Sequence, residues 1–144
     1  METYYREIVR VLTAIRETQG EAMERAAAHV ARTLAQDGLV YLFGCGHSHM
    51  LAEEGFYRAG GLGAVSAVLP AELMLHEGAV KSSALERRAD LAADIAARYP
   101  MGARDTLVVF STSGINGLPV EMARLGREAG AAVIAASSGA YRED

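Results

Sequence analysis

Short apolar runs that end in turns rich in glycine or serine are the feature that most constrains the fold of this chain. Three such runs lead directly into a turn: residues 39–43 into 44–48, residues 106–110 into 111–114, and residues 132–136 into 137–139. Short continuous apolar runs are typical of strands buried on both faces, as in parallel sheets. In open parallel sheets, ligands bind beyond the carboxyl ends of the strands. The sequence therefore predicts a binding site at these turns.

Helical segments separate the strands. Residues 64–69 form a fourth apolar run, and residues 70–80 follow no clear period and are expected to be a loop with a helical turn. Ser83 and Glu86 have the spacing of a capping box, which begins helices. Alternation of strands and helices predicts an α/β fold with a parallel sheet and right-handed crossovers. Three helices are predicted between the strands: from His49 to about Ala59, from Ser83 to Tyr99, and over residues 118–129.

Residues 1–37 have the spacing of two helices interrupted at Gln19-Gly20. So much apolar helix surface must cover either the sheet or a partner subunit. We expect one domain overall, with residues 1–37 as a helical segment packed on the domain or on a dimer partner and residues 38–144 as the α/β part. The apolar positions are Tyr4, Ile8, Val11, Leu12 and Ile15, and then Met23, Ala26, Ala27, Val30 and Leu34.

Composition excludes several classes of protein. Of the 144 residues, 51% are hydrophobic and 22% are charged, which suits a folded core and excludes a disordered chain. The net charge of −4 argues against nucleic acid or an anionic membrane as the main partner. No apolar run reaches the roughly 18 residues that a membrane helix needs. The single cysteine, Cys45, cannot form an internal disulfide, so the cytoplasm is the expected compartment.

The chain ends at Asp144, shortly after the apolar run of residues 132–136, without a helical segment to cover that strand. An α/β sheet normally closes with a helix on that side. We therefore expect either a further C-terminal portion or a partner that covers this strand.

The turn Ser111-Thr112-Ser113-Gly114 is the strongest candidate site. It follows a strand and precedes a helix, so hydroxyls and the free N–H groups of a helix N-terminus would form a cradle for an anion. Gly114 lets the backbone approach a ligand, and Asn116 adds an amide. The alternative is an ordinary serine cap on a helix.

The turn Gly44-Cys45-Gly46-His47-Ser48 is the second candidate. It is not a dinucleotide fingerprint, because His49 stands where the third glycine would be. It is neither a Walker loop nor a hydrolase elbow, since no Gly-Lys-Ser/Thr occurs and Met50 replaces the second glycine of the elbow. What remains is a glycine turn with a hydroxyl, suited to a phosphate or a sugar hydroxyl.

Several side chains are candidate acids and bases, with His76 and Glu77 the strongest. A base that moves a proton between adjacent carbons would allow aldose–ketose isomerisation. The alternative for each carboxylate is a solvated surface side chain. A metal held by Cys45, His47 and His49 is a weaker alternative, because no established metal spacing occurs, and we expect neither a metal nor a cofactor. The full candidate set is His47, His49, Glu53, Glu54, Glu72, His76 and Glu77, and the only lysine, Lys81, could contact a phosphate.

These turns resemble the paired phosphosugar loops of SIS (sugar isomerase) domains. Residues 43–50, 54–61 and 75–79 are further similar to a bacterial group of SIS-domain proteins labelled phosphosugar isomerases or sugar-phosphate-binding proteins. The resemblance covers essentially the whole chain. It implies a flavodoxin-like three-layer domain that forms a homodimer with sites near the subunit interface. By motif position, the phosphosugar-binding residues would be Gly46, Ser48, Ser111, Thr112, Ser113, Gly114 and Asn116.

The resemblance implies phosphosugar binding and, if the protein is catalytic, aldose–ketose isomerisation, for which Glu77 or His76 is the candidate base. A non-catalytic phosphosugar sensor and a sugar-phosphate etherase or lyase stay open as alternatives, because the fold is shared by all three. Asn116 stands where many members have threonine or serine, and Ile115 offers no polar contact. Members of the group continue for about another hundred residues, a length that would supply a last strand, a closing helix and usually one catalytic residue.

Overall fold

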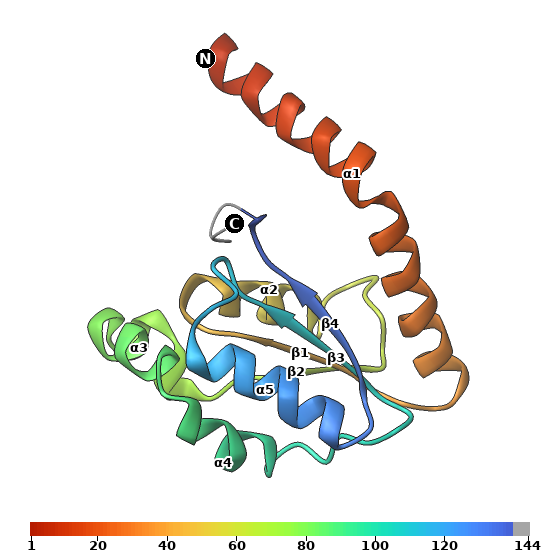
Figure 1. The fold of residues 1–144 in the computed structure, drawn as a ribbon, viewed down its shortest axis with the longest axis vertical. Helices are drawn as coiled ribbons and strands as arrows, with labels where there is room; N and C mark the ends of the chain where they lie inside the picture. The colour runs from red at the N-terminus through yellow and green to blue at the C-terminus, as the bar shows by residue number, and fades with distance from the viewer. Residues whose placement is uncertain (140–144) are drawn as a thin grey trace.

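The computed structural model describes residues 1–139 and shows a four-stranded parallel sheet with helices on both faces (Figure 1). The strands are β1 (Val40–Gly44), β2 (Val65–Val68), β3 (Thr106–Phe110) and β4 (Ala132–Ala136), in the spatial order β2-β1-β3-β4. Val40 pairs with both Val65 and Thr106, and Thr106 pairs with Ala132. The strands therefore start in register, and their carboxyl ends lie at one edge of the sheet. The predicted α/β fold with a parallel sheet is confirmed.

Alternate residues of β1 face two different layers. Tyr41 and Phe43 pack with side chains of α4 (Ala92–Ala96) and α5 (Gly117–Glu128), whereas Leu42 packs with Ala52 of α2 (His49–Gly55). Figure 1 shows the same division, with α2 on one face and α3 (Ala79–Glu86), α4 and α5 on the other. Because β1 is covered on both faces, all five of its residues are buried. This burial explains why its sequence is continuously apolar.

The predicted interruption at Gln19-Gly20 is wrong. Helix α1 runs without a break from Glu2 to Ala35. Gly20 costs a helix only about 1 kcal/mol relative to alanine and leaves the backbone hydrogen bonds intact, so a single glycine does not end the helix. The C-terminal part of α1 contacts the sheet, where the Thr33 and Thr106 hydroxyls lie 2.7 Å apart. The rest extends away from the domain (Figure 1), and Tyr4 is 71% exposed.

The predicted single helix from Ser83 to Tyr99 is also wrong. The structure has α3 (Ala79–Glu86), a 3-10 turn η4 (Ala89–Leu91) and α4 (Ala92–Ala96), so Ser83 lies inside α3 and begins no helix. The chain turns after Glu86 because it passes the start of α5. A Cβ on Gly117 would lie 2.8 Å from the carbonyl oxygen of Arg87. This close approach between two helices is tertiary, so no capping pattern records it.

The remaining boundaries differ little from the predictions. Helix α2 ends at Gly55 rather than near Ala59, because its end packs so tightly on β1 that a Cβ on Gly55 would lie 2.4 Å from Leu42 Cδ1. Ser48 does not cap α2 with its side chain, since a 3-10 turn, η1 (Gly46–Ser48), comes first. Residues 70–80 contain two further 3-10 turns, η2 (Ala71–Leu73) and η3 (Leu75–Glu77), before α3 begins. Residues 140–144, which the α/β part was expected to include, lie outside the described chain.

Candidate functional site

The turns after β1 and β3 meet because these strands are neighbours in the sheet. A cavity of about 380 Å³ lies between the two turns and α3. The first turn, the second turn and one face of α3 thus form three walls of one hollow at the carboxyl edge of the sheet. Its lining residues are Cys45, Gly46, His47, Ser48, Leu75, Ala79, Ser82, Ser83, Glu86, Thr112, Ser113 and Asn116.

Five of the seven predicted phosphosugar-binding residues line this cavity: Gly46, Ser48, Thr112, Ser113 and Asn116. The other two, Ser111 and Gly114, do not line it. Ser111 is buried, and its Oγ accepts a hydrogen bond from the Gly114 N–H at 3.2 Å. Gly114 has a φ of 69°, a conformation that favours glycine. These two residues therefore fix the shape of the second turn, which presents Thr112 and Ser113 to the cavity.

The second turn leaves several hydrogen-bond donors available. Asn116 is the N-cap of α5, but its side chain makes no capping hydrogen bond, so it does not satisfy the first N–H groups of the helix. Ser113 Oγ accepts from the Ile115 N–H at 3.5 Å, which leaves the Ser113 hydroxyl hydrogen free to donate. Donors gathered at a helix N-terminus form a site suited to an anion. The alternative of an ordinary serine cap does not apply to α5, since its N-cap residue is Asn116.

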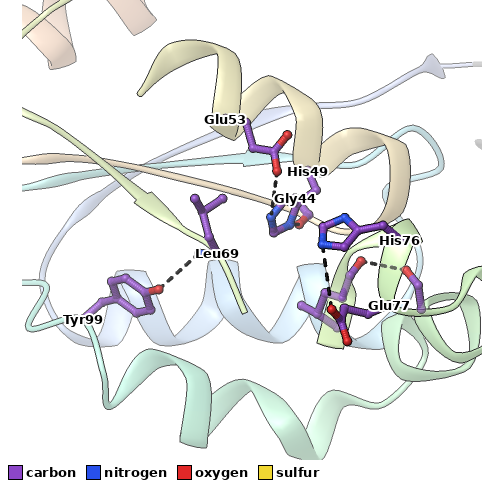
Figure 2. Close-up of polar contacts among 9 residues, drawn as sticks. Gly44, His49, Glu53, Leu69, His76, Glu77 and Tyr99 are labelled. Atoms are coloured by element: carbon purple, nitrogen blue, oxygen red, sulfur yellow. Dashed lines mark hydrogen bonds and ion pairs between the residues drawn. The ribbon is translucent and has the colours of Figure 1, made fainter. Parts of the chain in front are cut away.

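The first turn is held closed by a buried histidine. A Cβ on Gly44 would lie 2.5 Å from the Ser48 carbonyl oxygen, so only glycine allows the turn to close this tightly. His49 Nδ1 lies 3.1 Å from the Gly44 carbonyl oxygen and donates to it, because that oxygen can only accept (Figure 2). His49 is 2% exposed and does not line the cavity. It positions the first turn and does not face a ligand there.

His49 and Glu53 share one face of α2, as their spacing predicts. His49 Nε2 lies 3.9 Å from Glu53 Oε1 (Figure 2), and this nitrogen is buried without a hydrogen-bond partner in the described part of the chain. Glu54, by contrast, pairs with Arg58, and Glu72 lies 3.6 Å from Arg98. Glu54 and Glu72 therefore belong to local ion pairs, and Glu53, Glu54 and Glu72 do not line the cavity.

His76 and Glu77, the predicted acid–base residues, lie beside the cavity and do not line it. They belong to η3, whose first residue, Leu75, is part of the lining. His76 Nε2 lies 3.9 Å from Glu77 Oε1, and the two side chains are 65% and 49% exposed (Figure 2). The structure thus brings the pair to the edge of the cavity, in contact with solvent.

Sequence reasoning missed the wall that α3 contributes. Ser83 and Glu86 line the cavity, although their spacing was interpreted as a capping box. Their three-residue spacing was still informative, because it places both side chains on one face of a helix. What the sequence did not show is that α3 begins at Ala79, so that this face is turned toward the two glycine- and serine-rich turns.

Cys45 is a buried residue of the cavity lining. Burial, together with the negative charge of Glu86, raises the pKa of the Cys45 thiol to about 12. The thiol therefore stays protonated at neutral pH, which makes it a poor nucleophile. Across residues 1–139, no three side chains of histidine, cysteine, aspartate or glutamate come together as a group that could hold a metal ion.

Comparison with known proteins identifies the family. The SIS domain family matches residues 3–138. The chain belongs to the SIS domain family. Phosphoheptose isomerase of Neisseria gonorrhoeae has a similar fold, with a TM-score of 0.76 and 19% identity over 99% of this chain and 76% of that one. The predicted family and its three-layer α/β fold are thereby confirmed.

Curated relatives of this SIS domain are longer than the chain. A UPF0309 protein of Listeria innocua is 46% identical over 133 residues, which are 92% of this chain and 54% of the relative. A UPF0309 protein of Caldanaerobacter subterraneus is 44% identical over 144 residues, which are 99% of this chain and 58% of the relative. The chain therefore spans little more than half the length of these relatives. Within residues 1–139, no helix has both the length and the apolar character needed to cross a membrane.

Proposed function

We propose that this SIS domain binds a phosphorylated sugar, with the phosphate on the second turn and the sugar in the cavity. The observation that carries the proposal is the convergence of the turns after β1 and β3 on one cavity of about 380 Å³. That volume lies within the usual range of small-molecule sites, roughly 300–1,000 Å³. The family and the fold shared with a phosphoheptose isomerase support the same proposal.

The second turn has the chemistry that a phosphate needs. The hydroxyls of Thr112 and Ser113 can donate to phosphate oxygens, and so can the N–H groups that begin α5. Charge-assisted hydrogen bonds of this kind are roughly twice as strong as neutral ones, and the helix N-terminus adds a favourable dipole. We expect Ser48, which lines the cavity from the first turn, to contact either the phosphate or a sugar hydroxyl.

For the reaction, we propose aldose–ketose isomerisation with Glu77 or His76 as the base. Such a base must reach the two adjacent carbons between which the proton moves. Support comes from the position of both residues directly after Leu75, at the edge of the cavity. A non-catalytic phosphosugar sensor is the second candidate, and the observation that favours it is that neither side chain lines the cavity.

We also propose that the chain forms a homodimer or a larger homo-oligomer through α1. Apolar positions in the N-terminal half of this helix, which the sequence predicted to be covered, are exposed in the single chain, among them Tyr4, Val11 and Leu12. A second copy would remove this surface from water, which favours association by roughly 25 cal/mol per Å² of apolar area. Light scattering after size exclusion should give the mass of two or more chains, and a monomer at micromolar concentration would contradict this proposal.

Isothermal titration calorimetry and thermal unfolding with a panel of phosphorylated sugars test the proposed function. The panel contains hexose, heptose and amino-sugar phosphates, with inorganic phosphate and NAD as controls. A ligand present at 100 times its Kd should stabilise the native chain by about 2.7 kcal/mol. Conversion of the binding sugar between aldose and ketose then separates an isomerase from a sensor. Stabilisation by NAD without any response to a sugar phosphate would contradict the proposal.

A further inference from the structure

Glu86 is the one acidic residue in the described lining of the cavity. It is the last residue of α3 and lines the cavity together with Ser83, which lies one helical turn before it. The second turn lines the same cavity through Thr112, Ser113 and Asn116. A ligand bound on the second turn would therefore share the cavity with a carboxylate from α3.

The Glu86 carboxylate is unpaired among the residues that the structure describes. In the chain from residue 1 to 139, it makes no hydrogen bond and no ion pair, whereas Glu7, Glu54 and Glu121 each pair with an arginine. The described lining contains no lysine or arginine that could neutralise it. Glu86 is half-buried, and its carboxylate oxygens can accept hydrogen bonds that no protein group supplies. A ligand in the cavity could donate these hydrogen bonds.

The wall that bears Glu86 is firmly held. Ser82 is buried, and its hydroxyl donates to the Leu73 carbonyl oxygen at 2.7 Å. Just after Glu86, the Arg87 carbonyl approaches α5 so closely that a Cβ on Gly117 would lie 2.8 Å from it. The carboxylate is therefore carried by a backbone fixed against both η2 and the start of α5. Its position in the cavity is built into the fold.

We propose that Glu86 determines which sugar phosphates this site accepts, an inference that rests on the proposed phosphosugar binding. Glu86 accepts hydrogen bonds from hydroxyl or ammonium groups of the sugar while the phosphate lies on the second turn. A sugar phosphate that carries a second acidic group would bring a carboxylate into the cavity with Glu86. Two like charges in a partly buried site repel each other strongly. The ligand class is therefore neutral sugar phosphates and amino-sugar phosphates, and acidic sugar phosphates are rejected.

Calorimetry with matched probes tests this selection. Glucose 1-phosphate pairs with glucuronic acid 1-phosphate, which has the same ring and differs by a carboxylate at C6. N-acetylglucosamine 6-phosphate pairs with N-acetylmuramic acid 6-phosphate, which carries an additional lactyl group with a carboxylate. The wild-type chain should bind the neutral member of a pair at least about tenfold more tightly, the factor typical of one hydrogen bond to a charged group. Glu86→Gln keeps the shape and removes the charge, so the ratio of the two Kd values should fall by about tenfold.

Two further variants separate a local effect from a general one. Glu128→Gln removes a carboxylate at the far end of α5, outside the cavity, and should leave the ratio unchanged. Glu86→Asp keeps the charge on a shorter side chain, so it should keep the rejection of acidic sugars even if Glu86→Gln folds poorly. Circular dichroism and thermal unfolding show whether each variant is folded.

The outcomes distinguish the selection from the binding on which it rests. Equal affinity of the wild-type chain for both members of a pair overturns the role of Glu86 and leaves phosphosugar binding intact. An unchanged ratio in folded Glu86→Gln, or loss of selection in folded Glu86→Asp, overturns it as well. If none of these probes and no other phosphorylated sugar binds, the proposed function fails and this inference fails with it.

Discussion

His49 Nδ1 lies 3.1 Å from the carbonyl oxygen of Gly44, and this hydrogen bond links the two ends of the first turn. The bond joins the end of β1 to the first residue of α2, and both residues are buried. Because the turn between them lines the cavity through Gly46, His47 and Ser48, the geometry of the site depends on a side chain outside it.

We predict that His49→Ala destabilises the chain by about 2 kcal/mol. The substitution leaves a void in place of the buried imidazole and removes the donor to Gly44, and both changes are among the causes of large stability losses. Urea unfolding measures the free energy. His47→Ala is the control for stability, because His47 is exposed and its loss should cost less than about 0.5 kcal/mol. Equal stabilities of the two variants would show that His49 does not support the turn.

The Thr33–Thr106 contact gives a second prediction, on the joint between α1 and β3. The two hydroxyls are 2.7 Å apart and buried, so Thr33→Val should leave the Thr106 hydroxyl without a partner and cost about 1–3 kcal/mol. The double variant Thr33→Val with Thr106→Val should cost less than the sum of the two single variants, because neither hydroxyl is then left unpaired. Additive losses in urea unfolding would contradict this coupling.

A third prediction concerns the second turn. Ser113→Ala should weaken binding of a phosphorylated sugar about tenfold or more, because it removes one hydrogen bond to a charged group. Calorimetry measures the change in Kd. Ser66→Ala, on β2 and outside the cavity, is the matched control and should bind with wild-type affinity. Wild-type affinity of Ser113→Ala would remove this serine from the phosphate site.

The strands could be predicted from the sequence, and the reason is local. Thr106–Phe110 and Ala132–Ala136 match the predicted ranges. A continuous apolar run bounded by turn residues indicates a strand within about five residues, so no distant contact is needed to find it. The broken helix over residues 83–99 could not be predicted, since it depends on how closely Arg87 passes Gly117. At Gly20 the local sequence is misleading in the other direction, because a single glycine predicts a break that the continuous helix α1 does not have.

The candidate site also has a part that the sequence predicts and a part that it does not. The two turns were found because glycine and serine directly after a strand are visible in the sequence, and parallel pairing of β1 with β3 then brings them together. Glu86 was missed because its place in the cavity depends on the start of α3 and on its packing beside α5. A site wall built by a helix from the next crossover leaves no local motif.

The proposed base gives a fourth prediction. His76→Ala should lower kcat for aldose–ketose conversion much more than it changes KM, because an exposed residue at the edge of the cavity contributes little to ground-state binding. His76→Gln keeps a polar side chain without a titratable group and should show the same loss. Steady-state kinetics on the sugar that binds measures both constants. Intact turnover in both variants would assign the base to another residue.

The last prediction follows from the buried thiol. The pKa of Cys45 is raised from its ordinary value of 9.0 to about 12, chiefly by burial and further by the charge of Glu86. Above pH 9 the unfolded chain loses this proton while the folded chain keeps it, so the unfolded state binds fewer protons and stability falls as pH rises. The contribution is complete below pH 9 and is lost progressively toward pH 12. Urea unfolding at pH 8, 9 and 10 should therefore show a steeper loss of stability for the wild-type chain than for Cys45→Ala, which has no thiol to ionise. Parallel curves for the two chains would mean that Cys45 is more accessible to solvent than its burial in the cavity lining implies.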